Sequence, residues 1–159
     1  MVFKYHNKEF RRLPDEDSTL ESLRQAGVTQ GLYHFPHCAS MKEMGDPDML
    51  EKMERGPVGF LTVMPSGPPA MPKFLTLWFL YTLLVGVFVA YISGRTLGPD
   101  AEYLAVFRLT GTIAFMTYGL SQMVDSIWKG TPWSVTAKGI FDGLVYALVT
   151  AGAFGWLWS

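Results

Sequence analysis

The stretch FLTLWFLYTLLVGVFVAYIS, residues 74–93, contains no charged side chain. As an α-helix it would be about 30 Å long, which matches the thickness of the hydrocarbon core of a bilayer. Two further apolar stretches follow, over residues 103–125 and about 134–158. The sequence therefore predicts an all-α transmembrane fold, in which the three helices pack as a three-helix membrane bundle.

Charged residues divide the chain into two parts. Residues 1–72 hold 18 of the 27 acidic and basic side chains, which is twice the number in residues 73–159. Soluble domains are close to one quarter charged, so residues 73–159 are predicted to form a membrane domain and residues 1–72 a small, mostly cytoplasmic extension. A net charge of −1 indicates no nucleic-acid partner, and the single cysteine excludes an intramolecular disulfide.

The extension is predicted to contain two short helices. Ser18 and Glu21 match the capping box S-x-x-E, which predicts a helix over residues 19–26. Asp46 is a good N-cap for a second helix, which would end at Gly56.

Two apolar stretches of the extension, residues 31–35 and 58–64, are bounded by proline or glycine and are predicted to be strand-like. A stiff proline-rich linker over residues 64–72 is expected to lead into the first membrane helix. Because the extension has few large apolar residues, we expect it to rest on the membrane surface or on a partner.

Basic residues near the ends of the predicted helices favour one orientation. Cytoplasmic loops are enriched in lysine and arginine, and the side of the membrane that holds the N-terminus has more of them. The N-terminus is therefore predicted to be cytoplasmic and the C-terminus outside. The N-terminal side has five basic residues, Lys52, Arg55, Lys73, Lys129 and Lys138. The other side has two, Arg95 and Arg108.

Small residues recur at every fourth position in the first and third predicted helices. Such rows let helix backbones approach closely in lipid, so both are predicted to be contact surfaces. They either pack the chain's own bundle or contact another copy or a partner subunit. The third helix has Gly139, Gly143, Ala147, Ala151 and Gly155, and the first has Thr82, Gly86, Ala90 and Gly94.

Charges within membrane helices are candidates for function. Arg108 and Asp125 are separated by about 25 Å of helix, so they are expected near opposite faces of the bilayer. Asp142 is expected near the start of the apolar part of the third helix, where it and Asp125 could pair with Lys129 and Lys138. The alternative is a polar path of a channel or transporter, formed by Arg108, Tyr118, Ser121, Gln122, Asp125 and Asp142.

The stretch YHFPHCASMKEM, residues 33–44, is the densest group of potential metal ligands. Imidazole and thiolate bind zinc or copper, and thioethers favour Cu(I). The alternative is structural, with the methionines filling a small core or resting on the membrane. The potential ligands are His34, His37, Cys38, Met41 and Met44.

The sequence contains no phosphate-binding glycine loop, no H-E-x-x-H motif and no catalytic pair placed by a motif. All three histidines precede residue 73, which excludes a haem held by paired histidines within the membrane helices. We therefore predict no cofactor, and the residues identify no reaction that the protein would catalyse.

Three stretches, HCASMKEMG (37–45), GPVGFLTVMPSGPP (56–69) and DGLVYALVTAGAFGWLW (142–158), carry a resemblance. Together they resemble an uncharacterised family of small three-helix bacterial membrane proteins with no assigned function. The resemblance implies a bacterial inner membrane and one architectural unit, and it implies no activity, cofactor or site residue.

Two classes of function remain. The favoured one is a non-enzymatic accessory, assembly or self-associating subunit of a membrane complex, whose partners are the lipid bilayer and either another copy or a partner subunit. It is motivated by the rows of small residues. The alternative is a small oligomeric channel or transporter that uses the polar face of the second helix. Metal handling by residues 34–44 is a third and weaker hypothesis.

Overall fold

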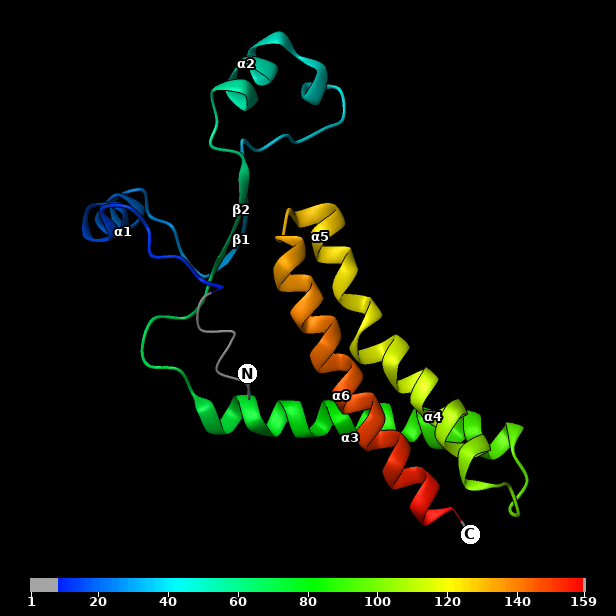
Figure 1. Ribbon diagram of the computed structural model, residues 1–159. Helices are drawn as coiled ribbons and strands as arrows, with labels where there is room; N and C mark the ends of the chain where they lie inside the picture. The colour runs from blue at the N-terminus through cyan, green and yellow to red at the C-terminus, as the bar shows by residue number, and fades with distance from the viewer. Residues whose placement is uncertain (1–8, 159) are drawn as a thin grey trace. The chain divides into compact units, whose positions relative to one another are not determined.

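A computed structural model describes residues 9–158 of the chain, which is mostly helical. Its contacts divide it into two units, Met1–Pro68 and Pro69–Ser159. Three helical segments, all in the second unit, are long and apolar enough to cross a membrane (Figure 1). The two units are described separately.

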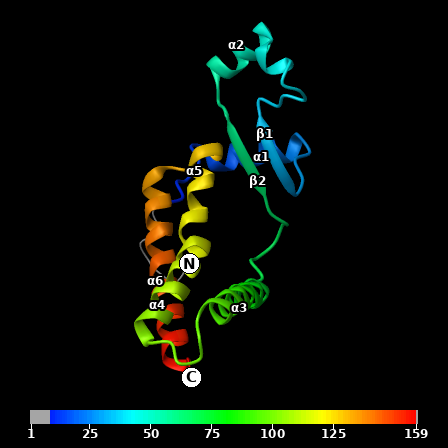
Figure 2. The same ribbon diagram turned by 90° about the vertical axis from the view of Figure 1, so that its right-hand side faces the viewer.

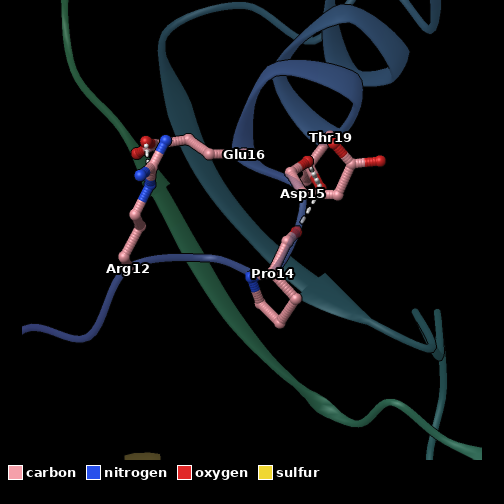
Figure 3. A network of polar contacts seen from close by, with 5 residues as sticks. All are labelled: Arg12, Pro14, Asp15, Glu16 and Thr19. Carbon is pink, nitrogen blue, oxygen red and sulfur yellow. Dashed lines mark hydrogen bonds and ion pairs between the residues drawn. The ribbon is translucent and has the colours of Figure 1, made fainter.

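The first helix of the N-terminal unit, α1 (Glu16–Gln25), begins earlier than predicted. The expected capping box at Ser18 is wrong, because Ser18 lies inside the helix and the N-cap is Asp15. In Figure 3 the start of α1 is held by Thr19, whose Oγ1 donates to the Asp15 carbonyl at 3.0 Å, and by Arg12, whose Nε donates to Glu16 at 2.9 Å. Acidic residues in the first turn also complement the helix dipole.

The second helix, α2 (Pro47–Arg55), confirms its predicted signals. The Asp46 side chain accepts a hydrogen bond from the Asp48 backbone N–H at 3.1 Å, which satisfies one of the free donors at the helix start. Gly56 follows the helix with a φ of 58°, a conformation that glycine adopts without strain. A short 3-10 turn, Glu43–Gly45, precedes it.

A two-stranded antiparallel sheet joins the predicted strand-like stretches. β1 (Gly31–Phe35) pairs with β2 (Gly59–Val63), with Gly31 opposite Val63 and Phe35 opposite Gly59. An isolated two-stranded hairpin is marginally stable in water. No residue between positions 9 and 68 is buried, so this part of the chain has no core of its own.

The C-terminal unit begins with α3 (Met71–Thr96). The predicted linker is therefore too long at its C-terminal end, because Met71 and Pro72 already belong to the first turn of α3. Proline is tolerated there, since the N–H it lacks has no partner within the helix. Among the 26 residues of α3 only Val85, Val89 and Ser93 are buried.

The second apolar stretch was predicted to form one continuous α-helix, but it forms three consecutive pieces. They are α4 (Tyr103–Tyr118), a 3-10 turn (Leu120–Gln122) and α5 (Met123–Lys129). The third stretch forms α6 (Trp133–Leu157), close to its predicted bounds.

The helices of this unit pack unequally. α4 and α6 run antiparallel and lie side by side along most of their length, whereas α3 crosses them at a steep angle and is seen nearly end-on in Figure 2. The core of the unit lies where the three helices meet. It consists of Val85, Val89, Ala114, Tyr118 and Ala147.

Candidate functional site

Asp142 is about 13 Å into α6, a helix about 37 Å long, and lies one helical turn after Lys138. Its depth in the bilayer stays a prediction. Asp125 lies near the end of its segment in α5, where its Oδ1 pairs with Lys129 Nζ at 2.7 Å, a pairing that the sequence suggested.

The break between α4 and α5 lies beside this part of α6. A Cβ added at Gly143 would lie 2.5 Å from the Cα of Gly119 and 2.6 Å from its backbone nitrogen. The two backbones are therefore in direct contact at the point where α4 ends. A 3-10 turn inside a longer helical segment often marks a hinge or a functional site.

Four aromatic rings from all three long helices meet near this break. The Trp78 ring lies 5.6 Å from that of Tyr81 and 5.7 Å from that of Tyr146, and the Tyr118 ring lies 5.8 Å from Tyr81 and 5.9 Å from Tyr146. These distances are typical of tilted and edge-to-face aromatic pairs. The rings therefore form one connected group across α3, α4 and α6.

Asp142 adds a carboxylate to this group. It lies one helical turn before Tyr146 on the same face of α6. We call the five residues the crossing cluster: Trp78, Tyr81, Tyr118, Asp142 and Tyr146.

Sequence reasoning selected only Tyr118 and Asp142 of these five residues. It missed Trp78 and Tyr81, which lie three positions apart on α3, and Tyr146, which lies four positions after Asp142. Aromatic residues at helical spacing in the middle of an apolar stretch are a signal that could have found them.

The other residues of the predicted polar path have different surroundings. Ser121 is exposed and its Oγ donates to the Thr117 carbonyl at 2.8 Å. Gln122 is exposed and its side chain faces Gly139, where an added Cβ would lie 3.5 Å from it. Arg108 is exposed and lies near the start of α4. Only Tyr118 of the α4 side chains named for the path joins the crossing cluster.

The row of small residues on α6 faces α4. Gly143, Ala147 and Ala151 are buried. A Cβ added at Gly155 would lie 2.7 Å from the Tyr103 ring, and Gly139 contacts Gln122 as described above. We call Gly139, Gly143, Ala147, Ala151 and Gly155 the α6 row. Along most of this row the backbone of α6 lies close to α4.

The row on α3 has open surroundings. A Cβ added at Gly86 or Gly94 would have no atom of residues 9–158 within 4 Å. Ala90 is exposed and Thr82 is half-buried. We call these four residues the α3 row. The buried residues of α3 belong to the neighbouring row, one position earlier at Val85, Val89 and Ser93.

The candidate metal ligands of the N-terminal unit lie on and after β1. The His34 ring packs 4.6 Å from the Phe60 ring, and Cys38 is half-buried. Met41 and Met44 are exposed. Within residues 9–158 no three His, Cys, Asp or Glu side chains come together in a way that could hold a metal ion.

One carboxyl of α1 has a shifted pKa. Arg24 and Gln25 both hydrogen-bond to Glu21, and the bond from Arg24 at 2.9 Å contributes most to lowering the Glu21 pKa. Because all three side chains are exposed, this group is a solvated helix surface and not a binding site.

The crossing cluster combines one carboxylate, three phenols and one indole. Such a group can attract a cation, exchange hydrogen bonds and present ring faces to a ligand. Comparison of the chain with protein-family models, with curated proteins and with solved structures finds no match.

Proposed function

We propose that the protein is a non-enzymatic subunit of a bacterial inner-membrane complex, anchored by a three-helix membrane bundle. In this proposal the α4–α6 pair holds the chain in the bilayer. α3 and the N-terminal unit contact another copy of the chain or a partner subunit.

Unequal burial is the observation that carries the proposal. The α6 row is in contact with α4, whereas α3 buries three of its 26 residues and the α3 row is open. In the N-terminal unit, residues 9–68 bury none. In a bilayer either lipid or another protein can cover the open face of α3, and a row of small residues is typical of a surface that packs against another helix.

The lengths of the helices support three crossings despite the steep angle of α3. The 26 residues of α3 give a helix about 39 Å long, which exceeds the hydrocarbon core of about 30 Å and can therefore tilt. The 25 residues of α6 give a helix about 37 Å long, which can also tilt and still span the hydrocarbon core. Tilts in opposite directions let α3 cross the other two helices while all three span the bilayer.

The basic residues support a cytoplasmic N-terminus. Lys73 lies at the start of α3, and Lys129 and Lys138 lie at the end of α5 and in the first turns of α6. Three crossings place these three residues on one side of the membrane, which the positive-inside rule assigns to the cytoplasm. The C-terminus is then outside.

Size measurement in mild detergent tests the association. The full chain should migrate as a complex larger than one copy, and mass spectrometry should identify either more copies or one stable partner. Gly86→Leu, which fills the α3 row, should shift the distribution towards single chains. Gly152→Leu on α6, where an added Cβ also meets nothing within 4 Å, is the matched control. A single chain for the wild type would overturn the proposal.

A channel or transporter is the second candidate, and one observation favours it. The break between α4 and α5 lies beside Asp142, an ionisable residue of α6, because the neighbouring Gly143 contacts Gly119. Broken helices and intramembrane carboxylates are common features of transport sites. Proton or cation flux into liposomes should then fall in Asp142→Asn, and equal flux in the wild type and the variant would exclude a transport role for Asp142.

A further inference from the structure

An apolar pocket of about 270 Å³ lies between α3 and the C-terminal end of α6. One residue of α3 forms one wall, and the last turns of α6 with the residue that follows them form the other. The pocket is partly open, because several of these side chains are exposed. We call it the rim pocket, and its lining residues are Ala90, Ala153, Phe154, Leu157 and Trp158.

The side chains of the rim pocket offer no free polar group. Trp158 is the only lining residue with a polar side-chain atom, and its indole Nε1–H donates to the Gly98 carbonyl at 3.0 Å. A bound water needs two to four polar partners, and apolar cavities stay dry and bind apolar molecules instead. The pocket therefore selects an apolar ligand.

The same hydrogen bond places the rim pocket at one end of the helices. It joins the residue after α6 to the loop after α3, so both helix ends lie together there. Ala90 lies about 9 Å before the end of α3. If these helices cross the bilayer, the pocket lies where the hydrocarbon core meets the head groups, the level at which indole rings settle. Its open side then faces lipid.

The size of the rim pocket favours an acyl chain over a side chain of another protein. A cavity of about 150 Å³ holds one benzene ring, so this pocket has room for roughly ten carbon atoms. A single leucine or phenylalanine side chain would leave about half of it empty, and the lining atoms would lose their dispersion contacts there. An acyl chain can fill the pocket and continue into the bilayer through the open side.

Charges at this end of α3 match a phospholipid head group. Arg95, in the last turn of α3, is exposed, and its guanidinium lies 6.0 Å from the centre of the Tyr91 ring. Among residues 9–158 it forms no ion pair with a carboxylate. Arginine binds phosphate well. Asp100 and Glu102 lie in the loop that follows and complement an ammonium group, so a zwitterionic head group fits better than an anionic one.

From this arrangement we propose that the rim pocket binds one acyl chain of a zwitterionic phospholipid, whose phosphate lies at the level of Arg95. The bound lipid would join the end of α3 to the end of α6. This inference rests on the membrane crossings of the proposed function, and it does not depend on the proposed association with another protein.

Photochemical labelling tests the site. The probe is phosphatidylethanolamine with a diazirine in one acyl chain, added in increasing amounts to the purified full chain in mild detergent. After irradiation, adducts mapped by mass spectrometry should concentrate on residues 153–158 and reach a plateau at one lipid per chain. Labelling that rises without a plateau, or that spreads evenly along the three long helices, would overturn the proposal.

Two pairs of variants separate the pocket from the rest of the lipid-facing surface. Ala153→Phe fills the pocket and should lower the adduct yield about tenfold. Val149→Phe, one turn earlier on α6 at a position that is 68% exposed, is its matched control and should label as the wild type does. Arg95→Gln should lower the yield about threefold, because it removes the charge for the phosphate, while Arg108→Gln should change it little. Each variant must keep the wild-type circular dichroism spectrum.

The outcomes are distinct. Equal labelling of Ala153→Phe and Val149→Phe would overturn the pocket, and stronger labelling by a phosphatidylglycerol probe with the same chain would overturn the head group. A photoreactive phenylalanine derivative at position 157, used in cells, provides a further arm. Its adduct should be with lipid, whereas an adduct with protein would show that a partner fills the pocket. Absence of lipid adducts along all three helices would instead contradict the membrane crossings.

Discussion

Two rows of small residues, one on α6 and one on α3, are similar in sequence but have different surroundings. At Gly143 on α6 an added Cβ would meet the backbone of Gly119, whereas at Gly86 on α3 it would meet nothing. Spacing of four residues shows that a helix offers a smooth surface. A row of small residues therefore forms a helix contact only where a second helix runs alongside it, as α4 does along α6.

The largest effect is expected for Gly143→Ala. The new methyl group would meet backbone atoms of Gly119 at 2.5 and 2.6 Å, and backbone cannot move aside as a flexible side chain can. We expect a loss of about 2 kcal/mol or more in the free energy of unfolding, measured by denaturant titration in micelles.

Gly86→Ala is the control for that prediction, and it should not lower the free energy of unfolding, because alanine favours a helix and meets no neighbour here. Equal destabilisation by the two substitutions would remove the distinction between the α6 row and the α3 row.

A smaller effect is expected for Ser126→Ala, in the contact between α5 and α6. The hydroxyls of Ser126 and Thr136 share a buried hydrogen bond. Removing one partner leaves the other buried and unsatisfied, which costs about 1–2 kcal/mol. The double variant Ser126→Ala with Thr136→Val should be more stable than the single one. If both single variants match the wild type in the same unfolding assay, the hydrogen bond does not stabilise the α5–α6 contact.

The smallest effect is expected for Ser93→Ala, in the contact of α3 with the rest of the unit. The Ser93 Oγ is buried and has no hydrogen-bond partner among residues 9–158. Replacing it by a hydrogen atom removes an unsatisfied polar group, so stability should be unchanged or rise by up to about 1 kcal/mol. A clear loss of stability would show that the hydroxyl makes a contact that holds α3 in place.

Hydropathy predicts the long helices well because each one exposes apolar side chains along its length. α3 and α6 differ from their predicted bounds by only a few residues. In the N-terminal unit, Asp46 and Gly56 mark the ends of α2 because N-cap and C-terminal glycine signals act locally.

Features that depend on contacts between helices were not predictable. The break after Tyr118 lies where Gly119 touches Gly143. Glycine at 119 is a weak signal for a break, because glycines also occur inside unbroken α3 and α6. The grouping of Trp78 with Tyr146 requires the crossing angle of α3, which spacing along one helix does not contain.

The central claim is that another protein covers the open face of α3. A photoreactive phenylalanine derivative placed at position 86, in cells that express the full chain, tests it most directly. We predict a discrete adduct with a second copy or with one partner subunit at position 86, and none at position 148, which is exposed on α6. Adducts with lipid alone at both positions would contradict the account.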